Sequence, residues 1–134
     1  MLQAIDISTS ALIAQRTRLN TISNNIANTS TVIDEYGRPN PYRRKFTVFA
    51  PGDPGGAGEQ GVHVAGIYDD AKPFVQRFEP GHPAADSEGY VSYPNVDLSE
   101  EFVNALGATR AYEANIAAIE MTKAMAASTL RILA

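Results

Sequence analysis

The chain contains no cysteine among its 134 residues, so no disulfide contributes to its stability and packing alone must hold the fold. Positive charge is also scarce. The formal net charge is −4, and the one basic cluster is the short run Arg43-Arg44-Lys45. Nucleic-acid binding requires a basic surface, so the composition argues against nucleic acid as a partner.

Long apolar runs are missing as well. No stretch approaches the roughly 18 apolar residues that a membrane helix needs. The first residues lack the basic and apolar regions of a cleavable signal peptide, because Asp6 interrupts the start of the chain. We therefore expect no direct membrane span, and either a soluble chain or one exported without a cleaved signal peptide.

Helix breakers are absent from most of both ends. All 8 prolines, and every glycine except Gly107, lie between Gly37 and Pro94. Proline costs roughly 3 kcal/mol inside a helix and glycine about 1 kcal/mol. The distribution predicts a mainly α protein with a small β insertion. Residues 1–36 and 95–134 form long helices that pair as an antiparallel coiled coil, and residues 37–94 form a β-hairpin or small sheet domain between them.

The N-terminal segment carries an apolar row with a spacing of seven, completed by one residue three positions after its third member: Ile5, Leu12, Leu19, Ile22 and Ile26. A polar row that includes Asn24 and Asn28 lies beside it. Asparagine is a poor helix former, so we interpret these amides as hydrogen-bonding groups for another chain. For Asn28, an ordinary frayed helix end is an equal alternative.

The C-terminal segment has its own start signals. Asn95 or Asp97 can cap the helix, and Glu100 and Glu101 complement the positive end of its dipole. Its predicted packing stripe has steps of three, four or seven and is interrupted at Lys123: Leu98, Phe102, Ala105, Thr109, Tyr112, Ile116, Ile119, Ala126, Leu130 and Leu133. A second apolar line lies on another face: Ala118, Met121, Met125 and Ile132. One helix with two apolar faces needs two partners, which favours self-assembly.

The pattern of the middle segment predicts short strands over residues 42–49, 61–68, 74–78 and 89–93. It also predicts a flexible glycine-rich loop over residues 51–58. Its two histidines, His63 and His82, have no diagnostic metal-ligand spacing, and His82 fits a local turn. No nucleotide-binding or nucleophile motif occurs. We predict no catalytic, cofactor-binding or metal site, and hence no enzyme.

Several motifs resemble one family. The N-terminal ones are Ser8-Thr9-Ser10-Ala11-Leu12 and Asn24-Asn25-Ile26-Ala27-Asn28; the C-terminal ones are Arg110-Ala111-Tyr112-Glu113-Ala114-Asn115 and Lys123-Ala124-Met125. Together they resemble the bacterial flagellar rod and hook axial proteins. The middle motifs, such as Pro41-Tyr42-Arg43-Arg44-Lys45 and Glu79-Pro80-Gly81-His82-Pro83, resemble the FlgC branch of that family.

This resemblance implies a structural subunit of the proximal rod, exported through the flagellar type III apparatus and assembled in the periplasm. It implies copies of the chain and the rod proteins FliE, FlgB and FlgF as neighbours. A self-contained coiled-coil adaptor, or another member of the rod family, is the alternative.

The basic run at residues 43–45 is a further candidate. We expect Arg43, Arg44 and Lys45 to make polar contacts between subunits, for example with Glu100 or Glu101 of a neighbour. A solvated strand edge and anionic lipid are the alternatives.

Overall fold

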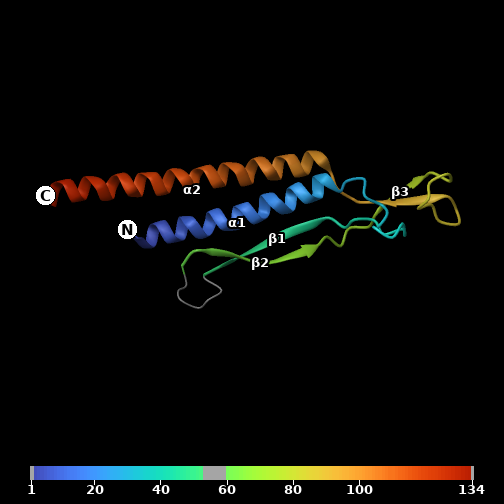
Figure 1. Ribbon diagram of the computed structural model, residues 1–134, viewed down its shortest axis with the longest axis horizontal. Coiled ribbons are helices and arrows are strands. Elements are labelled where there is room, and N and C mark those ends of the chain that lie inside the picture. Colours follow the sequence, from blue (N-terminus) through green and yellow to red (C-terminus); the bar gives the residue numbers. More distant parts are fainter. Residues whose placement is uncertain (1, 53–59, 134) are drawn as a thin grey trace.

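The computed structural model describes residues 2–52 and 60–133. Along the sequence, one long helix precedes four short strands and a second long helix follows them (Figure 1). The elements are α1 (Leu2–Ala27), β1 (Lys45–Pro51), β2 (Val62–Asp69), β3 (Val75–Phe78), β4 (Tyr90–Tyr93) and α2 (Leu98–Leu133). The predicted class, two terminal helices around a small β region, is confirmed. Most of the predicted glycine-rich loop falls on residues 53–59, outside the described residues.

Helix α1 ends earlier than the predicted segment, at Ala27 rather than near residue 36. The side chain of Asn28 donates to the carbonyl oxygen of Asn24 at 2.9 Å, and its own Oδ1 accepts from the hydroxyl of Thr31 at 3.0 Å. Amide side chains that bond to nearby backbone compete with helix continuation. Asn28 therefore ends the helix through local hydrogen bonds, and a contact of this residue with another chain stays a prediction.

Helix α2 begins as predicted from its cap. Oδ1 of Asp97 accepts from the backbone N–H of Ser99 at 2.8 Å, and the Asp97 carbonyl accepts from the N–H of Glu101 at 3.0 Å. The carboxylates of Glu100 and Glu101 follow in the first turn, where they complement the helix dipole. Of the two candidate caps, Asp97 is the one the fold uses.

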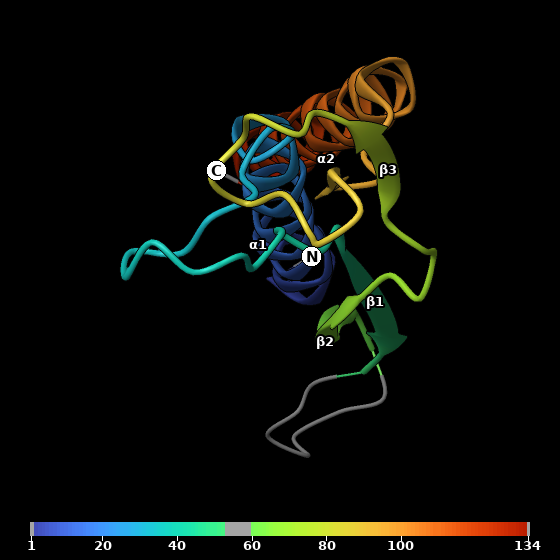
Figure 2. The same cartoon turned by 90° about the vertical axis from the view of Figure 1, so that its right-hand side faces the viewer.

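The molecule has three layers, and α1 is the middle one. Helix α2 runs antiparallel to α1 on one side and extends past its N-terminus, while the β1–β2 hairpin lies along the other side of α1 (Figures 1 and 2). Both hairpin strands contact α1. At one such contact Gly61, with a φ of 92°, brings the backbone N–H of Val62 within 3.1 Å of Ser10 Oγ. A Cβ at Gly61 would lie 2.7 Å from that same oxygen, so only glycine fits there.

The strands form two separate antiparallel hairpins rather than one sheet of three or four strands. In the first, Phe46 pairs with Tyr68, and the register shifts between Val48 and Phe49. In the second, Val75 pairs with Tyr93. The connection between the hairpins contains Pro73, which has no N–H for a continuing ladder, so the second hairpin turns away from the first.

Within the described residues, few side chains are fully buried. One small cluster contains Val32, Ala84 and Val91 and lies where the second hairpin meets the segment after α1. Elsewhere the buried apolar residues are Ala14, Ile22 and Ala108. The helix pair is therefore held by a narrow seam, and much of its apolar surface stays uncovered.

Candidate assembly surface

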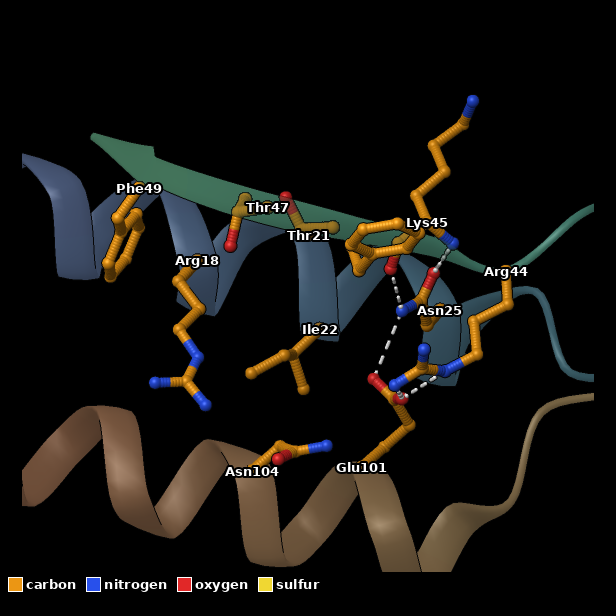
Figure 3. A pocket seen from close by; sticks show the side chains of 11 residues that line it. Arg18, Thr21, Ile22, Asn25, Arg44, Lys45, Thr47, Phe49, Glu101 and Asn104 are labelled. Carbon is orange, nitrogen blue, oxygen red and sulfur yellow. Dashed lines mark hydrogen bonds and ion pairs between the residues drawn. The ribbon is translucent and has the colours of Figure 1, made fainter. Parts of the chain in front are cut away.

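A polar junction joins α1, β1 and α2 at the base of the helix pair (Figure 3). Its centre is Asn25, of which 1% is exposed, and Glu101, of which none is exposed. The Nδ2 of Asn25 donates to the Lys45 carbonyl at 2.7 Å and to Glu101 Oε2 at 3.0 Å. Its Oδ1 accepts from the Tyr42 hydroxyl at 3.0 Å and from the Lys45 N–H at 2.9 Å. Both donors and both lone pairs of this amide are thus used.

The buried carboxylate of Glu101 is neutralised by Arg44. Arg44 Nε lies 2.7 Å and Nη2 lies 2.6 Å from Glu101 Oε1, and Nη1 lies 3.3 Å from Asp70 Oδ2. Burial by itself would lower the pKa of Arg44, but the hydrogen bond and charge of Glu101 raise it overall. A buried carboxylate is costly unless it is paired and hydrogen-bonded, and here it is both.

Groups beside this pair have shifted pKa values as well. Burial raises the pKa of the Tyr42 hydroxyl. The hydrogen bond from Lys45 Nζ to Asp69 Oδ1, at 2.7 Å, raises the pKa of the Lys45 ammonium. The backbone N–H of Lys72 bonds to Asp70 and lowers the pKa of that carboxyl. The junction is thus a network of matched donors and acceptors.

In the structure, each residue of the basic run Arg43-Arg44-Lys45 contacts a partner in its own chain. Arg44 contacts Glu101, which the sequence analysis assigned to a neighbour, and Lys45 contacts Asp69. Arg43 donates to the Asp70 carbonyl at 3.0 Å and lies 4.4 Å above the ring centre of Phe74. Arg44 and Lys45 thus pair with carboxylates of their own chain, whereas Arg43 bonds to backbone and to a ring, and contacts of the run between subunits stay a prediction. An Arg44→Glu exchange would therefore act on the fold itself, because it would place a second carboxylate beside Glu101.

The predicted apolar row of α1 lies largely inside the molecule. Ile22 is buried, and the other four members are half-buried: Ile5, Leu12, Leu19 and Ile26. The asparagines of the predicted polar row lie in different environments. Asn24 is exposed and Asn28 caps the helix, whereas their neighbour Asn25 supplies the long-range hydrogen bonds. The sequence does not single out Asn25 for this role, because nothing local marks it as buried.

On α2 the buried seam is shifted by one residue from part of the predicted stripe. Glu101 and Ala108 are buried, whereas Phe102 and Thr109, the next residue in each case, are exposed. A one-residue shift turns a helix position by about 100°. Three more members of the stripe are also exposed: Leu98, Ile116 and Leu130. Four are half-buried: Ala105, Tyr112, Ile119 and Ala126.

Three of the four residues in the second apolar line of α2 are exposed, and the fourth, Ala118, is half-buried. Met121 is 63% exposed, Met125 65% and Ile132 84%. We call these three residues the outer row. Large apolar side chains gathered on one helix face are typical of surfaces that meet a partner. The described part of α2 does not have the apolar length needed to cross a membrane, nor does α1.

The polar groups of the β region serve local structure. His82 Nδ1 accepts from the N–H of Ala84 at 3.0 Å, the turn role that the sequence predicts, and His63 Nδ1 lies 2.8 Å from the Gly52 carbonyl oxygen. Over residues 2–52 and 60–133, no three His, Asp or Glu side chains come together as a metal site. The described side chains of the candidate assembly surface can therefore provide apolar contacts and hydrogen bonds.

Two family models match the two ends of the chain, and known proteins are similar to it over nearly its full length. A family model described as flagella basal body rod protein matches residues 5–32, and one described as flagellar basal body rod FlgEFG protein C-terminal matches residues 87–132. The chain is 42% identical to the flagellar basal-body rod protein FlgC of Yersinia enterocolitica, over 98% of this chain and 97% of that one. It is 41% identical to FlgC of Borreliella burgdorferi, over 99% and 97%, and 37% identical to FlgC of Bacillus subtilis, over 96% and 95%.

Proposed function

The chain belongs to the FlgC family of flagellar basal-body rod proteins and is a structural subunit of the rod; from that premise we propose that it joins the rod through the helix faces that its own fold leaves open. The proposal includes a place in the proximal rod, the tubular shaft that transmits torque and surrounds the export channel. It also includes assembly without catalysis, because the buried polar side chains Asn25 and Glu101 serve hydrogen bonds and ion pairs within the chain.

The outer row of α2 is the observation that supports this proposal most directly. Its three side chains are each more than half exposed on a helix that extends past the end of α1 (Figure 1). Burying one such side chain fully stabilises a structure by roughly 1.5–3 kcal/mol. A chain that leaves several of them in water gains that free energy only when another chain covers them.

The same exposed surfaces suggest a different role for each segment of the chain. We propose that residues 1–36 and 95–134 form the rod core and that residues 37–94 form a β-rich insertion on its side. The half-buried row on α1 and the exposed members of the predicted α2 stripe, Phe102 and Ile116 among them, would then meet neighbouring helices. The basic run would contribute chiefly by holding the insertion against the helices.

The partners follow from the family resemblance. We propose copies of this chain and the rod proteins FliE, FlgB and FlgF as neighbours, and export through the flagellar type III apparatus into the periplasm without a cleaved signal peptide. The excess of uncovered apolar helix surface supports a chain with several neighbours over one with a single partner.

Basal bodies purified from a strain whose only copy of this gene carries an epitope tag would test the function. The tagged chain should be present in the rod, and removal of the gene should abolish both rods and motility. Normal rods without the chain would contradict the proposal.

The state of the free monomer gives a second test, which separates the rod subunit from the self-contained adaptor. Isolated helices depend on partners for most of their stability. The free chain should therefore show less helix by circular dichroism, and faster proteolysis of its ends, than the same chain in basal bodies. Full helicity and protection in the monomer would favour the adaptor.

A further inference from the structure

A groove lies beside the polar junction, with α1 as its floor and with β1 and α2 as its walls (Figure 3). Its volume is about 300 Å³. The floor carries Arg18 and Ile22, the β1 wall carries Thr47 and Phe49, and the α2 wall carries Asn104. The ion-paired side chains Arg44, Lys45 and Glu101 of the junction line it as well. The groove therefore combines an apolar surface with one positive charge, that of Arg18, that forms no ion pair with any described residue.

Arg18 points into this groove without a carboxylate partner in the described part of the chain (Figure 3). It is half-buried, whereas Arg44 and Lys45, on the neighbouring wall, both form ion pairs. A guanidinium held partly out of water beside Ile22 and Phe49 lacks the carboxylate that such groups usually bond. The groove therefore suits an apolar group that arrives with a carboxylate.

The opposite side of α2 carries such groups. Phe102 and Leu106 are each two residues from Asn104, which places them about 200° around the helix from it and hence on the side away from the groove. Both are exposed, and Leu98 extends their row by one turn. Glu113 lies eleven residues after Phe102, about three helical turns, and so returns to the same side. It too is exposed and forms no ion pair with any described residue. We call this row the ridge: Leu98, Phe102, Leu106 and Glu113.

We propose that the ridge of one copy enters the groove of the next, with its apolar side chains against the groove walls and Glu113 paired with Arg18. This inference rests on the proposed function and specifies which two faces meet. The ridge and the groove are different surfaces on opposite sides of one helix. A contact between unlike surfaces repeats from copy to copy and generates a ring or a helical array, as a tube requires, rather than a closed pair.

A charge exchange tests the pairing inside the rod. Arg18→Glu and Glu113→Arg should each reduce the amount of this chain in purified basal bodies by about tenfold or more, because each change puts like charges face to face at the contact. The double variant restores opposite charges and should recover most of the incorporation. Arg16→Glu is the matched control: it makes the same charge change on an exposed residue of α1 outside the groove. It should incorporate normally.

The outcomes separate the inference from the function on which it rests. Absence of the unaltered chain from basal bodies would contradict the function itself. Normal incorporation of both single variants would overturn the ridge-in-groove contact alone. If both single variants fail and the double variant also fails, the pair does not form between copies of this chain, and the inference is overturned in favour of a different rod protein in the groove.

A cross-link guards against variants that merely misfold. The chain has no cysteine of its own. In a variant with Asn104→Cys and Leu106→Cys, the two thiols point to opposite sides of α2 and cannot bond within one chain. Oxidised basal bodies should yield a ladder of cross-linked copies on a non-reducing gel, and neither single-cysteine variant should do so. Normal incorporation of the double-cysteine variant without a ladder would overturn the inference.

Discussion

The two ends of α2 differ in which side chains they bury and which they expose. Near its start Glu101, a carboxylate, is fully buried, whereas towards its end Met121 and Met125 stand mostly in solvent. A helix that only needed to stabilise a monomer would show the reverse. At the first end Glu101 bonds to Asn25 of α1 and to Arg44, the residue before β1, whereas the second end leaves apolar surface uncovered. One helix thus combines a buried polar anchor with the exposed apolar face that we propose for assembly.

The largest effect on the fold should come from Arg44→Met, which leaves Glu101 buried without its counter-charge. Removing one member of a buried ion pair destabilises a protein by about 3–5 kcal/mol. We expect a loss of that size in urea unfolding of the purified chain. The double variant Arg44→Met, Glu101→Met should recover most of it, since replacing both members by apolar groups is often neutral. A loss below 1 kcal/mol in the single variant would show that the junction is not an anchor.

Asn25→Asp should come next, because it keeps the shape of the side chain but turns a donor into an acceptor. The new oxygen would face the Lys45 carbonyl and Glu101 Oε2, both of which accept hydrogen bonds from the present amide. Buried groups left without partners cost about 1–3 kcal/mol, and more when charged. Asn24→Asp, on the exposed side of the same turn, is the control and should change the free energy of unfolding by less than about 0.5 kcal/mol. Equal losses in the two variants would remove the special role of Asn25.

At the other end of α2, Met125→Lys should separate folding from assembly. The residue is 65% exposed, so the free energy of unfolding of the monomer should change by less than about 0.5 kcal/mol. Incorporation into basal bodies should fall sharply, because the contact would bury an unpaired ammonium. Met125→Leu keeps the apolar surface and should assemble normally. Normal rods with the lysine variant would show that the outer row is not an interface.

The smallest effect should be a loss of stability at high pH. In the folded chain the pKa values of Tyr42 and Lys45 are raised above their ordinary values of 10.0 and 10.5. A group whose pKa rises on folding stabilises the fold below its unfolded pKa, and this contribution disappears as the pH rises through the folded value. As the pH is raised, the melting temperature should therefore stay constant up to the unfolded pKa of Tyr42, 10.0, and decline above it. Tyr42→Phe should make the decline shallower, and an unchanged decline would assign it to other groups.

The elements of this fold could be predicted from local chemistry. The distribution of proline and glycine located both helices, and Asp97 could be identified as a cap because its side chain bonds to residues two and three positions later. Each of the four strands overlaps its predicted range. Such features depend on residues close in sequence, and a sequence displays those directly.

The buried junction could not be predicted in the same way. Glu101 was interpreted as a helix-dipole residue and Asn25 as one amide among several, since burial of a polar side chain depends on donors far along the chain. Arg44 lies 57 residues from Glu101, and Asn25 lies 76. These distant partners also account for the one-residue shift of the α2 seam, because the helix must turn Glu101 inward to meet them. A pattern of hydrophobicity alone places Phe102 there instead.

By itself the sequence determined the two terminal helices, the short strands between them, and a surplus of apolar helix surface beyond what one partner can cover. These follow from backbone propensity and periodicity, which act over a few residues. The tertiary structure alone decided which face of α2 turns inward, that the strands form two hairpins, and that Arg44 and Lys45 bind carboxylates of their own chain. These depend on which distant groups come within hydrogen-bonding distance, and the chain must be folded before such distances exist.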